Sequence, residues 1–170
     1  TLTAAQAAGK TITGAGTVDI SGAVGASSDL SSISSTLTFA TASTIAVNSG
    51  TLTLTAAQAA GKTITGAGTV SITGDVAASA DLTNISATLA FVGSTIAVAD
   101  SQTLKLTAAQ ATGKTITKTT DGILAITSIG SASQFTVADG TTLDVSSISA
   151  VLNLLDSGGT TARTSYAIGT

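Results

Sequence analysis

The sequence predicts an all-β fold, a parallel β-helix (β-solenoid) with a repeat of 52 residues. The stretch LTAAQAAGKTITGAGTV at residues 2–18 returns unchanged at 54–70, and its first part returns again from Leu106. Apolar residues alternate with Thr, Ser or Ala over four or five positions, which is the pattern of a short strand. Gly, Asp, Asn and Ser, which favour turns, separate these runs. A strict repeat of short strands favours a solenoid over a sandwich, because equivalent residues of successive coils then stack about 4.8 Å apart.

The repeat divides residues 1–155 into three copies, at about 2–53, 54–105 and 106–155, which we interpret as a single repetitive β-solenoid. Residues 156–170 depart from the repeat and hold the only Arg and Tyr of the chain, so we expect a linker or a capping tail there. A cap would cover the unpaired strand edges at an open solenoid end. Because the sequence begins inside a repeat, we interpret it as part of a longer protein.

The third copy is shortened. TVSIT at 69–73 corresponds to ILAIT at 123–127 with an offset of 54, whereas STIAVADSQTLKL at 94–106 corresponds to SQFTVADGTTLDV at 133–145 with an offset of 39, so about 15 residues are missing. A coil can be dropped because each solenoid unit contacts only its neighbours. A repeat of 52 residues fits two coils of about 26 or three of about 17; the missing segment favours three, and the coil count stays open. A one-residue slip between STIAVNSGTLTL at 43–54 and its next copy is expected to lie in a turn.

The Gly-Lys-Thr at 9–11, 61–63 and 113–115 matches the end of a phosphate-binding loop. In every copy an alanine, Ala56 in the second, replaces the glycine that opens such a loop. The lysine is followed by a strand-like TIT rather than by the helix whose N-terminus would face phosphate. We therefore assign no nucleotide or other cofactor site to this motif.

The same stretch fits a short helical corner. Thr3 and Gln6 have the spacing of a capping box, Ala favours helix, and Gly9 stands where a left-handed residue ends a helix. We expect one helical turn at each TAAQAAG or TAAQATG, including Thr55 to Gly61 and Thr107 to Gly113, between two strands.

The composition limits the chemistry. The chain has no His, Cys or Glu, nine Asp, six basic residues and a net charge of −3. A neutral-pH general base, a thiolate and a nitrogen or sulfur metal ligand are therefore missing, and a phosphate-tracking surface is not expected. The Asp residues, such as Asp100 and Asp139, are scattered at predicted turns rather than clustered as calcium ligands. We assign no catalytic, cofactor-binding or metal residue, and expect no enzyme activity, no nucleic-acid partner and no membrane span.

Two alternative functions stay open. Thr-x-Thr triplets, for example at 51–53 and 63–65, are the side chains from which a flat ice-binding face could be built, although Lys105 interrupts the column begun by Thr1 and Thr53. A carbohydrate-binding face is the other form of this binding-module alternative, although four aromatic residues offer little sugar stacking. A polysaccharide-acting β-helix enzyme is less favoured, because charged side chains are few and widely spaced.

The recurrent phrases LTAAQAAGKTITGAGTV, DLSSIS and DLTNIS resemble the Thr/Ala/Gly-rich tandem repeats of very large bacterial surface and secreted proteins, adhesin-like or hemagglutinin-like, over about residues 1–155. This resemblance implies an extracellular or cell-surface location and an extended, multi-repeat architecture. We therefore expect a non-enzymatic structural repeat region, a stalk, filament or sheath building block. Its expected partners are further repeats of the same chain or other copies by end-to-end or lateral association, with a cell-surface glycan as a further candidate.

Overall fold

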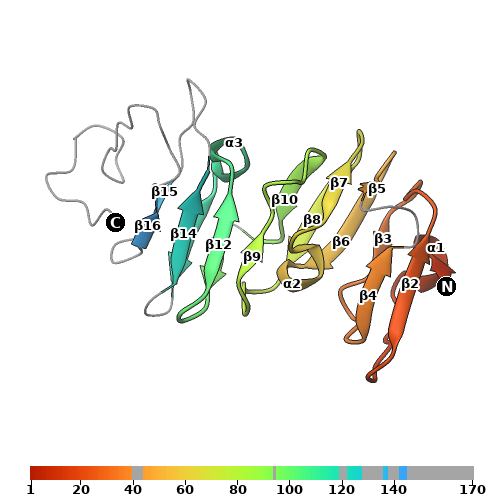
Figure 1. The fold of residues 1–170 in the computed structure, drawn as a ribbon. Coiled ribbons are helices and arrows are strands. Elements are labelled where there is room, and N and C mark those ends of the chain that lie inside the picture. The colour runs from red at the N-terminus through yellow and green to blue at the C-terminus, as the bar shows by residue number, and fades with distance from the viewer. Residues whose placement is uncertain (40–43, 94, 119–121, 128–135, 138–141, 145–170) are drawn as a thin grey trace, which may run out of the picture. The chain divides into compact units, whose positions relative to one another are not determined.

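The computed structural model describes residues 1–39, 44–93, 95–118, 122–127, 136–137 and 142–144. The chain forms two compact units, Thr1–Gly74 with Asn84–Val92, and Asp75–Thr83 with Gly93–Thr170. Both units consist of short strands in parallel ladders, with few short helices (Figure 1). The predicted all-β parallel solenoid is therefore confirmed.

The first unit contains three parallel sheets. Their strand orders are β1-β2-β4, β10-β8-β6-β3 and β5-β7. The strands are β1 (Leu2–Thr3), β2 (Thr17–Ser21), β3 (Ser28–Asp29), β4 (Thr36–Phe39), β5 (Thr44–Ala46), β6 (Thr51–Thr55), β7 (Thr63–Thr65), β8 (Thr69–Thr73) and β10 (Thr88–Phe91). Two helices of one turn, α1 (Ala4–Ala7) and α2 (Ala56–Ala59), belong to this unit.

The second unit repeats the same plan. Its sheets have the orders β16-β14-β12-β9 and β11-β13-β15, again with every described pair parallel. The strands are β9 (Ala80–Asp81), β11 (Thr95–Val98), β12 (Thr103–Leu106), β13 (Thr115–Lys118), β14 (Ile123–Ile126), β15 (Thr136–Val137) and β16 (Thr142–Asp144). One helical turn, α3 (Ala108–Ala111), follows β12.

The core is a stack of aliphatic side chains from alternate strand positions. Leu52 pairs with Val70 and Leu54 pairs with Ile72 on neighbouring strands, and all four are buried. Burial of one such side chain is worth roughly 1.5–3 kcal/mol, and like side chains stack directly above one another. The repeated sequence thus supplies its own complementary packing surface from rung to rung.

Paired residues are separated by 18 positions at Leu2 and Ile20 and by 24 positions at Ser28 and Leu52. Neither of the two uniform coil lengths considered from the sequence matches this range. The reason is that the strands do not stack in the order of the sequence.

Some strands lie in a ladder other than that of their sequence neighbours. Strand β3 lies between β2 and β4 in the sequence, yet β2 pairs directly with β4, and β3 pairs with β6. One repeat later, β9 lies between β8 and β10 but pairs with β12 of the second unit. We call residues 24–30 and 76–82 the exchange segments, because each joins the ladder of the following repeat before the chain returns.

The shortening of the third copy is explained by this arrangement. In the first unit, Ile85 bridges to Ile64 of β7, and β10 pairs with β8. In the second unit the corresponding places beside β13 and β14 are taken by β15 and β16. The omission therefore corresponds to one exchange segment and its returning strand, and later strands complete the ladder.

The one-residue slip lies in a turn, as predicted. Gly50, with φ 72°, precedes β6, and Ser101, with φ 59°, lies in the turn before β12. In both copies a serine hydroxyl accepts a hydrogen bond from the backbone N–H of the first residue of the following strand. The N–O distance is 3.1 Å from Thr51 to Ser27 at β6 and 3.0 Å from Thr103 to Ser79 at β12. The turn thus absorbs the extra residue without shifting the strand that follows.

Candidate functional site

The TAAQAAG corners are capped single helical turns, as predicted. In α2 the Thr55 hydroxyl accepts the N–H of Gln58, and the Gln58 side-chain oxygen accepts the N–H of Thr55 at 2.8 Å. The equivalent boxes, Thr3 with Gln6 and Thr107 with Gln110, are also complete. Gly61 has a φ of 67°, the left-handed conformation that glycine adopts most readily.

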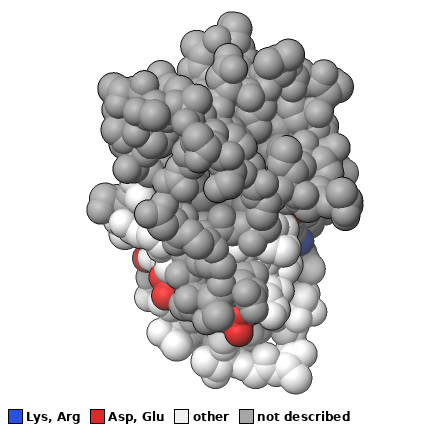
Figure 2. Space-filling model, turned by 90° about the vertical axis from the view of Figure 1, so that its left-hand side faces the viewer, with Lys and Arg blue, Asp and Glu red and all other residues white. Residues whose placement is uncertain are grey.

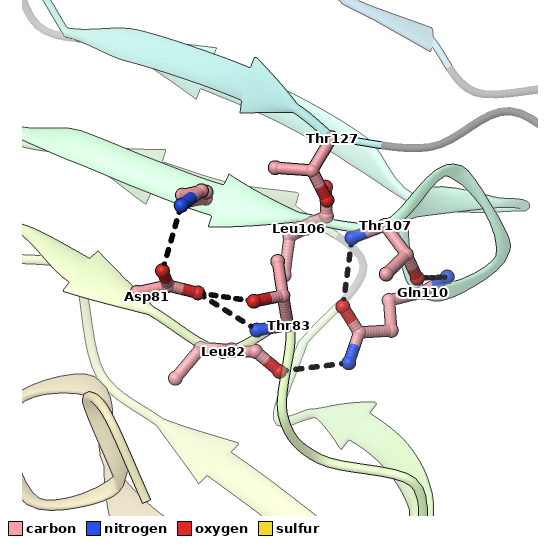
Figure 3. A network of polar contacts seen from close by, with 8 residues as sticks. Asp81, Leu82, Thr83, Leu106, Thr107, Gln110 and Thr127 are labelled. Carbon is pink, nitrogen blue, oxygen red and sulfur yellow. Dashed lines mark hydrogen bonds and ion pairs between the residues drawn. The ribbon is translucent and has the colours of Figure 1, made fainter. Parts of the chain in front are cut away.

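In two of the three corners the glutamine, Gln58 or Gln110, has a second role that the sequence analysis missed. The Gln58 Nε2 donates to the carbonyls of Leu30 at 2.9 Å and Ile33 at 2.8 Å, where the first exchange segment ends. Gln110 likewise donates to the Leu82 carbonyl at 2.8 Å (Figure 3). Glutamate could complete the capping box but could not donate these bonds. All three copies have Gln rather than Glu at this position, and this was the one feature of the sequence that could have indicated the second role.

The Gly-Lys-Thr motif does not have phosphate-loop geometry, as the second copy shows. The four-residue α2 precedes Lys62, and β7 follows it. A phosphate loop requires the helix to follow, with its N-terminal amides facing the anion. The geometry agrees with the interpretation of the motif as scaffold.

Aspartates shape the turns that end the exchange segments. Asp29 Oδ1 accepts the N–H of Ser31 at 2.9 Å and its hydroxyl at 2.6 Å. Asp81 makes the same pair of bonds with Thr83, at 3.0 and 2.6 Å. Both are local side-chain turns of the kind that Asp favours, so the prediction of turn-forming Asp is confirmed at these two positions. Asp139 lies outside the described residues.

The second repeat carries an ion pair at this place. The Lys105 Nζ lies 2.9 Å from Asp81 Oδ2 across the β9–β12 pair (Figure 3), with side chains 42% and 39% exposed. Partial burial acts to raise the pKa of Asp81, but hydrogen bonds from Thr83 and Lys105 outweigh it, so this pKa lies below its ordinary value. In the first repeat the corresponding residue opposite Asp29 is Thr53.

The described residues contain no group of three or more His, Cys, Asp or Glu that could hold a metal ion. Charged side chains are sparse on the described part of the face in Figure 2. Several of the charged groups placed by the structure take part in turns and rungs. Asp19, for example, accepts hydrogen bonds from the Thr1 and Thr38 hydroxyls, at 3.2 and 3.1 Å.

The Thr-x-Thr triplets do not build a repeating column in the described ladders. The neighbours of Thr53 are Asp29 and Ser71, and the neighbour of Thr65 is Ala46. No two neighbouring rungs of these ladders both carry the triplet. Single threonines do pair from rung to rung, as Thr51 with Thr69 and Thr69 with Thr88, but the second threonine of the triplet has no threonine beside it.

No helix in the described ranges has the length and apolar character needed to cross a membrane. The expected tail at 156–170 lies outside the described residues. No protein-family model, curated protein or solved structure matches this chain.

Proposed function

We propose that this chain is a non-enzymatic structural element, a β-solenoid building block of a stalk, filament or sheath of a bacterial extracellular surface protein. The observation that carries the proposal is the exchange of segments between successive ladders. A repeat that places a strand in the ladder of the next repeat is joined to it by hydrogen bonds as well as by the chain. Such a linkage suits a load-bearing scaffold.

The use of polar side chains supports the same proposal. Asp29 and Asp81 close turns, Lys105 pairs with Asp81, and Gln58 holds the carbonyls at a chain crossing. These are the residue types from which a binding or catalytic site would be built, and here they stabilise the repeat itself. The bacterial surface location rests on the resemblance of the repeated phrases.

Electron microscopy of the native particle tests the proposal. We expect rods or fibres in which this region forms part of the shaft. Compact, isolated domains without a rod or polymer would contradict a scaffold role. A glycan array and a freezing assay address the binding-module alternative, and we expect neither retention of a glycan nor thermal hysteresis.

A further inference from the structure

The second repeat carries an exposed asparagine whose side chain takes no part in the described hydrogen bonds. Asn84 lies in the turn directly before the bridge between Ile64 and Ile85. Its backbone carbonyl accepts the N–H of Ile64 at 3.2 Å, whereas its side-chain amide has no hydrogen bond among the described residues. The backbone of Asn84 thus belongs to the rung, and its side chain is left to solvent.

The first repeat builds the same turn without asparagine. The phrase DLTNIS, which contains Asn84, corresponds to DLSSIS, where Ser32 stands in its place and is also exposed. The next residue, Ile33, bridges to Ile12 just as its counterpart bridges in the second repeat. Asparagine is often favoured where the backbone is left-handed, but the φ of Asn84 is not positive. The conformation of the turn therefore gives no reason for asparagine at this position.

Asn84 begins the one Asn-x-Ser/Thr triplet of the chain, Asn84-Ile85-Ser86. Such a triplet, with any residue but proline in the middle, is the acceptor sequence for N-linked glycosylation. Ile85 is only 4% exposed, whereas Asn84 and Ser86 are both exposed. The fold buries the residue whose identity the acceptor sequence leaves free, and it presents to solvent the two side chains that define this sequence.

We propose that Asn84 is a site of N-linked glycosylation. The side-chain amide nitrogen forms a bond to the anomeric carbon of a sugar, and the bond between that carbon and a phosphate oxygen of the donor breaks. The phosphate leaves with the electron pair, and the amide nitrogen gives up one proton to a base of the transferase. The donor is a glycosyl phosphate, either a nucleotide sugar or a lipid-linked glycan. This inference goes beyond the scaffold function and rests only on the proposed extracellular location, where a bulky, hydrated group on the surface is expected.

The hydrogen bonds of the turn indicate when the sugar is added. The Asn84 carbonyl accepts from Ile64, and Ser86 donates its N–H to the Ile64 carbonyl at 2.8 Å. A transferase has to hold the backbone of the triplet in its own site, and the closed rung keeps these groups paired with Ile64. The sugar is therefore added before residues 84–86 pair with β7.

Mass spectrometry of the native full chain tests the site. We expect the peptide that contains Asn84 to have the mass of its sequence plus sugar, and fragmentation should place the sugar on this side chain. A short series of single sugars would identify a nucleotide-sugar donor, and an oligosaccharide shared with other proteins of the same cell would identify a lipid-linked donor. Native chains with an unmodified Asn84 would overturn the proposal.

Exchange of one residue between the repeats provides a matched pair of variants. Asn84→Ser introduces the residue of the first repeat, so it should remove the sugar and keep the melting temperature of the unmodified parent. Ser32→Asn gives the first repeat the same triplet, with Ser34 as its third residue, and should add a second sugar. A variant Asn84→Ser that still carries the sugar would refute the assignment. Failure of Ser32→Asn to gain a sugar would contradict the equivalence of the two turns as acceptors.

The third residue of the triplet has its own control. Ser86→Ala removes the hydroxyl that the acceptor sequence requires and should abolish the modification, although Asn84 is kept. Ser34→Ala makes the same change at the exposed counterpart in the first repeat and should leave the modification at the level of the parent. Equal modification of Ser86→Ala and the parent would show that the triplet is not what the transferase recognises, which would overturn the site.

The order of modification and folding can be measured with a transferase that uses nucleotide sugars. We expect full modification when the enzyme is produced together with the chain. Addition of the same enzyme to the purified, folded chain should give at least about tenfold less, because the reaction then depends on local opening of the rung. Equal modification in the two experiments would contradict the inferred order.

The sugar and the scaffold role fail independently. An unmodified Asn84 would leave the scaffold proposal in place, because that proposal depends on images of the native particle. Compact native particles with a modified Asn84 would remove the scaffold role and keep the glycosylation site.

Discussion

Residues 2–18 and 54–70 are the same 17 amino acids in two different surroundings. Both form the same capped turn, with the same hydrogen bonds between threonine and glutamine. They differ where the second copy also contacts β5 and the turn that follows it, as the burial of Ile64 and the contacts of Gly68 show. Local structure is thus a property of the repeat, whereas stability comes from the neighbouring repeat, as expected for a solenoid.

The largest difference between the copies is expected at the first glycine of Gly-Ala-Gly. Gly14 and Gly66 have φ of 117° and 113°, so alanine strains both, but only at Gly66 would its Cβ lie 2.2 Å from the Val47 carbonyl oxygen. We expect Gly66→Ala to lower the free energy of unfolding by about 4 kcal/mol and Gly14→Ala by about 1–2 kcal/mol. Urea titrations of the dilute monomer measure both, and equal losses would refute the difference.

Core truncation should give the next largest difference. Ile64 is fully buried, so Ile64→Ala is expected to cost about 3–4 kcal/mol, within the range for buried aliphatic residues. Ile12→Ala at the partly exposed position should cost about 1–2 kcal/mol. The same urea titration applies. A loss at Ile12 as large as at Ile64 would mean that the first copy is covered in solution.

The corner glutamines offer a smaller and more specific contrast. Gln58→Glu keeps the capping oxygen but removes the two bonds to Leu30 and Ile33 and brings a carboxylate next to their carbonyls. We expect a loss of about 2–3 kcal/mol at neutral pH. Gln6→Glu should change stability by less than about 0.5 kcal/mol, because capping by Glu is equivalent. Thermal unfolding monitored by circular dichroism measures the loss of stability in both variants.

The smallest effect is expected at the ion pair that distinguishes the second repeat. Lys105→Thr recreates the Asp29–Thr53 arrangement and should cost less than about 1 kcal/mol, since both charged groups are exposed by more than a third.

The pH dependence of that effect has a definite sign. The pKa of Asp81 is lower in the folded state than its ordinary value of 3.8. The stability that the ionised Asp81 contributes is therefore fully present above pH 3.8. It is lost as the pH falls through the lower pKa that Asp81 has in the folded state. When the pH is lowered from 5 to 2, the Lys105→Thr variant should lose less stability than the parent. Melting temperatures of the two proteins across this range measure the difference. A parent that is more stable in acid would contradict the sign.

The elements of the fold could be predicted from the sequence, and their order in the ladders could not. Alternation of Leu52 and Leu54 with threonine identified β6, and the Thr55 to Gly61 pattern identified α2 with its cap. These features depend on a few adjacent residues. The role of Gln58 at the chain crossing depends on Leu30, 28 positions away, and no local pattern reveals such a partner.

The exchange of segments was hidden by the repetition itself. When each strand presents nearly the same side chains, β3 would find a similar partner in its own repeat or in the next, so sequence matching does not choose between them. Each exchange segment follows a corner with a left-handed glycine, Gly22 with φ of 76° or Gly74 with φ of 74°. The uniform coil lengths expected from the repeat assumed stacking in sequence order.

The exchange segments also set an order in which the protein can fold as it is synthesised. When Asp29 has been made, its partner Thr53 is still 24 residues away, so β3 has no ladder to join until the next repeat begins to emerge. Strands β2 and β4, 19 residues apart, can pair first. Each repeat therefore leaves one segment waiting for its successor, and folding advances along the chain with a fixed delay rather than in independent blocks.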